Sequence, residues 1–234
     1  MAFAFDHLVS KQMAPAVDWR DVDRVGHFVQ FYRDDDFIVS IISKYLIHGI
    51  RLGDKCVVVA TPKHIKKIEN TLSRSLRGLF QTVQEDGLFI AFDAEDVLAE
   101  FMVGDTPDAV LFEKTVAPIL ETTPDARTRI FGEMVAILVA RGNPAAAVEL
   151  ERLWNQMRLK YAFSLFCAYP IEDLANSNAG DHFSDICCNH SNVLPDETYS
   201  TLTSADERLR CIAALQHRNL ELESTIASLK RKAA

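Results

Sequence analysis

The sequence lacks a long apolar run, because none of its apolar stretches approaches the roughly 18 residues that a membrane-spanning helix needs. The longest stretches are interrupted by Lys44, His48 or Arg141. The first residues, MAFAFDHLVSKQ, have no basic segment before an apolar one, so they do not have the pattern of a secretory signal peptide. The sequence therefore predicts a cytoplasmic chain that does not bind a membrane.

Cysteine is scarce, with five residues in a chain of 234. No two cysteines have the C-x-x-C spacing, and Cys56 and Cys167 lie inside predicted buried strands. An odd number of cysteines without paired spacing indicates reduced thiols and excludes a disulfide framework as the basis of the fold.

Basic residues are outnumbered, with 25 Lys and Arg against 33 Asp and Glu and a formal net charge of −8. Binding to DNA or RNA without sequence preference depends on a basic surface that neutralises phosphates. We therefore expect no direct nucleic-acid binding. A hydrophobic content of 48% is ordinary for a globular domain and supplies an ample core.

The sequence does contain a regular alternation of apolar strands and amphipathic helices. Continuous apolar runs, typical of strands covered on both faces, occur at 27–32, 56–60, 88–93 and 163–169. Helix starts are indicated at Thr61-Pro62, Asp93, Thr106-Pro107 and Asn143-Pro144. Such alternation predicts right-handed βαβ units and an α/β fold over about 22–175, with a parallel-rich sheet covered by helices on both faces.

The carboxyl ends of parallel strands are where an open α/β sheet binds its ligand. The residues expected there, which we predict to bound an apolar ligand pocket, are Tyr32, Thr61, Phe92, Glu133 and Tyr169. Glu133 precedes the apolar run 134–139, where a carboxylate is costly to bury unless it is paired. We expect Arg129, or Tyr32 and His27 across the sheet, to satisfy it, and direct contact with a ligand is the alternative.

Phosphate-binding signatures are missing, because neither G-x-x-x-x-G-K-[ST] nor G-x-G-x-x-G occurs in the sequence. The first strand is followed instead by Arg33-Asp34-Asp35-Asp36. Carboxylates at a helix start satisfy the free amides and the helix dipole, and they would repel a triphosphate. We expect neither a bound nucleotide nor another cofactor.

One cluster of possible metal ligands stands near the end of the predicted domain, at His182, Cys187, Cys188 and His190. Its spacing fits no common zinc module, and adjacent cysteines rarely converge on one tetrahedral ion. We interpret it as a buried thiol pair with a capping histidine and predict no metal, while a redox or metal role for Cys187, Cys188 and His190 stays open. Cys167 lies within a buried strand and is expected to be a core residue and not a nucleophile.

The last segment has the pattern of a coiled-coil helix. Ser204 and Glu207 have the spacing of a capping box, in which each side chain bonds the other's backbone N–H. Behind it, residues at alternating spacings of three and four form a heptad seam, namely Ile212, Leu215, Asn219, Leu222, Ile226 and Leu229. Branched residues and one Asn at a, with Leu at d, favour a parallel two-stranded coiled coil and hence a homodimer. The alternative is an amphipathic helix packed on its own domain.

Several short motifs, taken as a set, resemble the MEDS family, the methanogen/methylotroph and dichloromethane-regulator sensory domain. These motifs are His27–Tyr32 before an acidic helix start, Gly87 before a strand ending in Asp93, Phe131–Val135, Leu150-Glu151 with Trp154-Asn155, and Phe166–Tyr169. The resemblance covers about 24–195 and includes the segment from Ile186-Cys187 to His190 and Leu194-Pro195.

The resemblance implies a RecA/KaiC-like fold that has lost its phosphate loop and senses a small, hydrocarbon-like ligand. It places the sensory domain at 24–195, between the arm that the residues predict at 1–23 and the predicted signalling helix or coiled coil at 196–234. It also implies that this helix contacts a histidine kinase or transcriptional regulator, although no output module follows the helix. We expect a non-catalytic bacterial or archaeal sensor. The alternatives are a small enzyme or degenerate nucleotide-binding protein that uses Glu133 and Asp93, and a scaffolding subunit of a signalling complex.

Overall fold

The structure, a computed structural model, describes residues 26–120, 127–176 and 181–233. The chain divides into two units between Glu197 and Thr198, and each is described by itself. The predicted arm at 1–23 lies outside the described residues.

A six-stranded parallel sheet with the order β3-β2-β6-β7-β1-β8 forms the centre of the first unit. Its strands are β1 (His27–Tyr32), β2 (Lys55–Ala60), β3 (Phe89–Asp93), β6 (Thr128–Gly132), β7 (Phe163–Pro170) and β8 (Asn192–Leu194). A separate antiparallel pair consists of β4 (Met102–Val103) and β5 (Thr106–Pro107). The parallel sheet confirms the predicted fold class.

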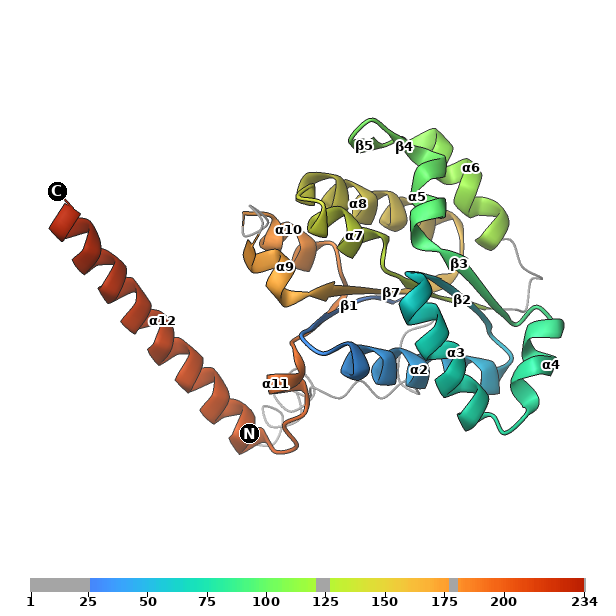
Figure 1. The fold of residues 1–234 in the computed structure, drawn as a ribbon, viewed down its shortest axis with the longest axis horizontal. Helices are drawn as coiled ribbons and strands as arrows, with labels where there is room; N and C mark the ends of the chain where they lie inside the picture. Colours follow the sequence, from blue (N-terminus) through green and yellow to red (C-terminus); the bar gives the residue numbers. More distant parts are fainter. Residues whose placement is uncertain (1–25, 121–126, 177–180, 234) are drawn as a thin grey trace, which may run out of the picture. The chain divides into compact units, whose positions relative to one another are not determined.

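Helices cover both faces of the sheet (Figure 1). One face carries α2 (Asp35–Leu52), α3 (Pro62–Ser75) and α4 (Leu79–Glu85). The other carries α5 (Ala94–Phe101), α6 (Ala109–Leu120), α7 (Met134–Ala140), α8 (Pro144–Lys160), α9 (Ile171–Asn176) and α10 (Phe183–Cys188). Among the described residues, no helix combines the length and the apolarity that crossing a bilayer requires.

Alternation along the strands sends side chains into two cores, because successive residues of a strand point to opposite faces. On the α7–α8 side, the main core includes Val29 of β1 and Leu165 of β7 together with Trp154. On the α2 side, Phe166 contacts the rings of Phe28 and Tyr45, with centroids 6.1 Å and 5.4 Å apart. Strands buried on both faces explain why the sequence shows continuous apolar runs.

Most helix boundaries follow the predicted capping residues. Asp34 accepts the N–H of Asp36 at the start of α2, and Asp93 accepts the N–H of Glu95 at the start of α5. Gly53, with φ of 78°, ends α2 in the left-handed conformation that glycine adopts without steric cost. The acidic residues after β1 therefore cap a helix, as the sequence predicted.

The prediction that Thr106-Pro107 opens a helix is wrong. These two residues form β5 and pair with β4, and α6 begins at Ala109. Asp108 is the capping residue, because its Oδ1 accepts the N–H groups of Val110 and Leu111, each at 2.9 Å. A carboxylate that accepts hydrogen bonds from two free backbone N–H groups stabilises a helix start more than a Thr-Pro pair does.

The second unit contains the long helix α12 (Ala205–Ala233), which follows the short α11 (Glu197–Ser200). The predicted capping box is confirmed, because Ser204 N–H donates to Glu207 Oε2 at 3.0 Å and Glu207 N–H donates to Ser204 Oγ at 3.2 Å. Four seam residues expose between 51% and 61% of their surface, namely Leu215, Leu222, Ile226 and Leu229.

Candidate functional site

Glu133 occupies the predicted position at the carboxyl edge of the sheet, between the end of β6 and the start of α7. It is 3% exposed, and its backbone N–H donates to the carbonyl oxygen of Val59 on the neighbouring strand at 2.9 Å. A carboxylate at this depth needs partners, because an isolated buried charge is expensive.

Three donors satisfy that carboxylate. Thr61 gives its backbone N–H at 2.9 Å and its hydroxyl at 3.2 Å to Oε2, and His64 Nδ1 contacts Oε1. Thr61 therefore begins α3 as predicted, but its hydroxyl binds Glu133 and does not cap the helix. The second ring nitrogen of His64, Nε2, lies 3.4 Å from Asp35 Oδ1. One imidazole is thus placed between two carboxylates from different elements.

The charges in this group favour a protonated imidazole. Burial alone would lower the pKa of His64, but the hydrogen bond and charge of Glu133, together with the charge of Asp35, raise it. Burial also raises the pKa of the Tyr32 phenol, and the charges of Glu133 and Asp35 raise it further. The carboxyl edge therefore combines a charged Glu133–His64–Asp35 triad with a neutral phenol.

The predicted partners of Glu133 are wrong in part. Arg129 Nε instead donates to Asp54 Oδ2 at 2.7 Å, and His27 Nε2 lies 3.1 Å from Glu151 Oε2. Arg129 lies four residues before Glu133 along an extended strand, a separation of about 13 Å, so it serves the opposite end of the sheet.

The structure brings together only some of the five residues predicted to bind ligand. Thr61 and Glu133 are in contact, and the charge of Glu133 raises the pKa of the Tyr32 phenol. Phe92 is partly buried on β3 and packs against the main core. Tyr169 belongs elsewhere, because its hydroxyl donates to Glu151 Oε1 at 2.8 Å. Whether any of these five contacts a ligand stays a prediction.

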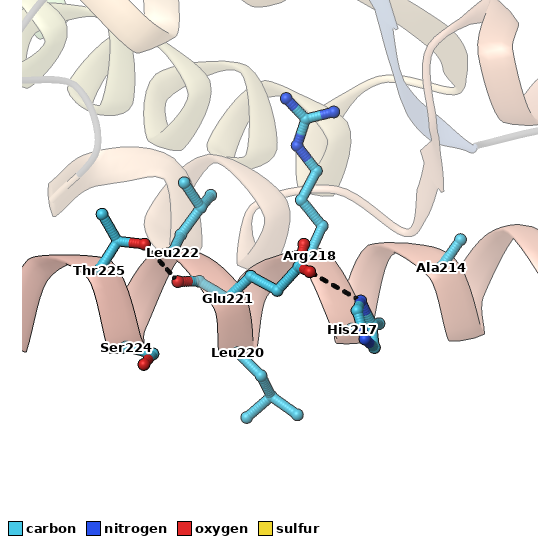
Figure 2. A pocket seen from close by; sticks show the side chains of 8 residues that line it. All are labelled: Ala214, His217, Arg218, Leu220, Glu221, Leu222, Ser224 and Thr225. Carbon is cyan, nitrogen blue, oxygen red and sulfur yellow. Dashed lines mark hydrogen bonds and ion pairs between the residues drawn. The ribbon is translucent and has the colours of Figure 1, made fainter.

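A surface hollow lies along α12, and none of its lining residues belongs to the carboxyl edge of the sheet. Its lining consists of Ala214, His217, Arg218, Leu220, Glu221, Leu222, Ser224 and Thr225. Figure 2 shows these side chains leaving a single helix in several directions, with the Thr225 hydroxyl donating to the carbonyl oxygen of Glu221 and His217 Nδ1 lying 3.7 Å from Glu221 Oε1. This is an open helix face and not an enclosed ligand cavity.

A second polar cluster surrounds Glu151, which is fully buried on α8. Its Oε2 lies 3.1 Å from His27 Nε2 and accepts the Cys167 thiol at 3.4 Å. Its Oε1 accepts the Tyr169 hydroxyl and lies 3.4 Å from His190 Nε2. The five residues come from β1, α8, β7 and the loop before β8.

Burial dominates the electrostatics of this second cluster. It raises the pKa of the Cys167 thiol and of the Tyr169 phenol, and the charge of Glu151 adds to both shifts. Burial would also raise the pKa of Glu151, but the nearby imidazoles of His190 and His27 outweigh it and hold that pKa below the usual range. Glu151 is therefore an ionised carboxylate in the core.

The predicted buried thiol pair is wrong, whereas a capping histidine is present, because His190 Nδ1 lies 2.6 Å from the carbonyl oxygen of Ile186 in the last turn of α10. Cys188 is exposed and Cys187 only half-buried, and the side chain of His182 makes no capping hydrogen bond at the start of α10. All five cysteines are free, as the sequence indicated. His190 alone of the four predicted ligands turns into the core, where it meets Glu151.

Sequence reasoning did not single out Glu151 as a functional residue, although a signal was present. It falls on the same face of α8 as Ala147 and Trp154, at spacings of four and three residues. A carboxylate on an otherwise apolar helix face has to meet a partner in the core. That pattern identifies the residue but not the histidines that pair with it.

The fold and these clusters define a parallel α/β domain with polar groups at the carboxyl edge of the sheet and without a phosphate-loop motif in its sequence. The family model for MEDS, the MEthanogen/methylotroph, DcmR Sensory domain, matches residues 26–191. The chain therefore belongs to the MEDS family of sensory domains, which confirms the resemblance seen in its motifs. No curated protein matches the sequence.

Proposed function

We propose that this protein is a non-catalytic sensor that binds a small, hydrocarbon-like ligand at the carboxyl edge around Glu133 and passes its state to α12. The observation that carries the proposal is that His64 contacts both Glu133 and Asp35 at the edge where parallel sheets bind ligands. Membership of a sensory family supports the same role.

The two carboxylates of the alternative enzyme are both engaged in structural bonds. Glu133 holds Thr61 and His64 through its two oxygens, and Asp93 caps α5 by accepting the N–H of Glu95. A general base has to be within hydrogen-bond reach of its substrate and free to accept a proton. This arrangement favours a binding role over catalysis.

A contiguous route leads from the triad to the end of the first unit. Asp35 begins α2, and the loop before it donates two backbone N–H groups to Glu197, from Arg33 at 3.0 Å and from Asp34 at 2.8 Å. Arg33 Nε also binds Asp196 Oδ2 at 2.8 Å. Glu197 is the last residue of the unit, so a ligand that moves Asp35 would change the anchor of the segment leading to α12.

The seam of α12 supports a role in assembly. Four of its apolar side chains are exposed, and Asn219 Nδ2 donates to Glu223 Oε1 of the same helix at 3.0 Å. An exposed heptad seam with one Asn at a is suited to pairing with a second copy of the helix. The proposed output is a homodimer that addresses a histidine kinase or transcriptional regulator through this helix.

Native mass spectrometry of the full chain purified from its own host tests the ligand. We expect a small bound molecule, and thermal-shift assays with small alcohols and chlorinated hydrocarbons should then identify its class. Glu133→Gln should abolish binding, whereas Glu113→Gln, which alters an exposed ion pair with Lys160, should not. A chain that carries no ligand and responds to none of these compounds, or a Glu133→Gln variant that binds like the wild type, would contradict the proposal.

A further inference from the structure

The cluster around Glu151 has a chemistry that sensing at Glu133 does not use. We propose that His27, Glu151, Cys167 and His190 form a binding site for a zinc-class divalent metal ion. Each residue offers one ligand atom, and these atoms all lie within 4.8 Å of one another. The proposal does not depend on which ligand the carboxyl edge binds.

In both histidines a contact at Nδ1 orients the ring so that Nε2 points toward Glu151. His27 Nδ1 lies 3.0 Å from Asn155 Oδ1, and His190 Nδ1 lies 2.6 Å from the carbonyl oxygen of Ile186. Asn155 is oriented by its own Nδ2, which donates to the carbonyl oxygen of Asn189 at 2.8 Å. Because each Nδ1 faces an acceptor, a neutral imidazole that carries its proton on Nδ1 has the Nε2 lone pair available for a metal ion bound beside Glu151.

Lone pairs outnumber protons at this centre. Two imidazole nitrogens, a sulfur and a carboxylate converge, and the donors that face them are the hydroxyl of Tyr169 and the thiol of Cys167. His190 Nε2 makes no hydrogen bond within the described part of the chain, although its side chain is 0% exposed. A buried polar atom without a hydrogen bond is costly, and a cation bound between His190 Nε2 and Glu151 would satisfy both groups.

The shortest distances between the ligand atoms are close to those of a tetrahedral zinc site. Bonds of about 2.0–2.3 Å from zinc to nitrogen, oxygen and sulfur place neighbouring ligands about 3.3–3.8 Å apart. Glu151 Oε2 lies 3.1 Å from His27 Nε2 and 3.4 Å from Cys167 Sγ, which is 3.5 Å from the same His27 nitrogen. His190 Nε2 is 3.4 Å from the other Glu151 oxygen. The four ligand atoms lie within 4.8 Å of one another, so a bound ion would have to draw the more distant pairs together by about 1 Å.

The chemistry of the donors selects the ion. Imidazole and thiolate ligands suit zinc, whereas calcium and magnesium prefer an all-oxygen shell. A thiolate and a carboxylate together carry two negative charges, which a divalent ion neutralises in the core. Binding would release the proton of the Cys167 thiol to solvent, with no change of oxidation state. Four protein ligands leave no open position, so the site is structural.

The site would fasten the edge strand to the rest of the domain. His190 lies two residues before β8, while His27 is on β1 and Cys167 on β7.

The alternative occupant of this cluster is a proton, which would leave one imidazolium paired with Glu151.

Zinc content and cobalt substitution distinguish a metal ion from a proton. The full chain, purified without chelators, should contain about one zinc per chain by mass spectrometry. After refolding with Co²⁺, a thiolate-to-cobalt charge-transfer band should appear and should persist in a chain with Cys187→Ser, Cys188→Ser and Cys211→Ser. Cys167→Ser should abolish the band, and Cys56→Ser, which alters another fully buried strand thiol, should keep it. Asn155→Ala, which removes the acceptor of His27 Nδ1, should weaken zinc binding about 10- to 100-fold.

Two results would overturn the proposal. One is a wild-type chain that holds no more zinc than a Cys167→Ser, His190→Gln double variant, and the other is a refolded chain without a charge-transfer band. If Cys167→Ser fails to fold, the cobalt spectrum of the triple variant decides. A band there requires a thiolate ligand from Cys167 or Cys56, and Cys56→Ser separates those two.

Discussion

Arg129 Nε lies 2.7 Å from Asp54 Oδ2, and both side chains are buried at the amino-terminal end of the sheet. The guanidinium also lies over the ring of Tyr45, 5.2 Å from its centroid. A Cβ at Gly49 would come within 2.5 Å of Arg129 Cδ. Glycine at this position of α2 therefore leaves the space that the arginine side chain occupies. The pair is thus enclosed by the strand, the helix and an aromatic ring.

Removing one member of this pair should destabilise the protein strongly. Asp54→Ala leaves a buried guanidinium without its carboxylate, and the free energy of unfolding should fall by about 3–5 kcal/mol. Urea denaturation measures the loss. Glu113→Gln is the matched control, because its ion pair with Lys160 is exposed and such pairs contribute about 1 kcal/mol or less. Equal losses in the two variants would contradict the expectation.

Stability should depend on pH through His64. Glu133 and Asp35 raise the pKa of His64 against the effect of burial, so folding favours its protonated form. This contribution is complete below the unfolded-state pKa of about 6.5 and is lost as the pH rises through the higher folded-state pKa. Burial lowers the pKa of His27, which acts in the opposite direction, so the measurement compares variants.

The comparison uses urea denaturation at several pH values above 6. His64→Gln should lose less stability than the wild type as the pH rises, because it lacks the titrating imidazole. His217→Gln, which changes an exposed histidine of α12, should follow the wild type. A stability-against-pH profile of His64→Gln that is parallel to that of the wild type would show that His64 takes up no proton on folding.

Nucleotides should not bind to the sheet. The backbone amides after β1 that would contact a phosphate already donate to Glu197, and Asp34, Asp35 and Asp36 surround that loop. Calorimetry with ATP, ADP and GTP in the presence of magnesium should give no saturable heat. Glu197→Ala should behave in the same way, because the three carboxylates still repel phosphate. A micromolar dissociation constant for any of these nucleotides would overturn this expectation.

Asn219 should determine how the helices associate. In a parallel dimer its amide pairs with its symmetry mate, whereas a shifted or antiparallel pairing leaves it unsatisfied among apolar residues. Asn219→Ile should therefore tighten association and broaden the range of oligomers seen by analytical ultracentrifugation. Asn192→Ile, on the edge strand β8, is a control that leaves the seam unchanged.

Truncation before Ser204 completes this test. The shortened chain should be a monomer if α12 makes the interface. A dimer that persists would place the interface on the sheet domain, and a wild-type monomer would contradict pairing through the helix.

Local signals made most of the fold predictable. The β-branched run at 56–60 became β2, and the Ser204–Glu207 spacing became a capping box, because each depends on residues within one turn or strand. The strand β8 was missed, since its three residues carry no pattern of their own and are extended through pairing with β1.

The candidate site was only half predictable for the same reason. The position of Glu133 follows from the end of a strand, but its partner His64 is 69 residues away and on another helix. The Glu151 cluster joins four separate elements, and His190 and His27 meet through tertiary packing. Sequence spacing identifies which charges need partners, whereas the fold decides which partners they find.

The place of β1 in the sheet also sets the order in which the chain can fold. It is the first strand of the sheet to be synthesised, yet its neighbours β7 and β8 are the last, and His27 bonds to a serine 164 positions later. Until those strands leave the ribosome, β1 has apolar side chains and two unpaired backbone edges, which makes it prone to aggregation. Productive folding therefore waits for almost the whole domain, and contacts of such long range make it slow.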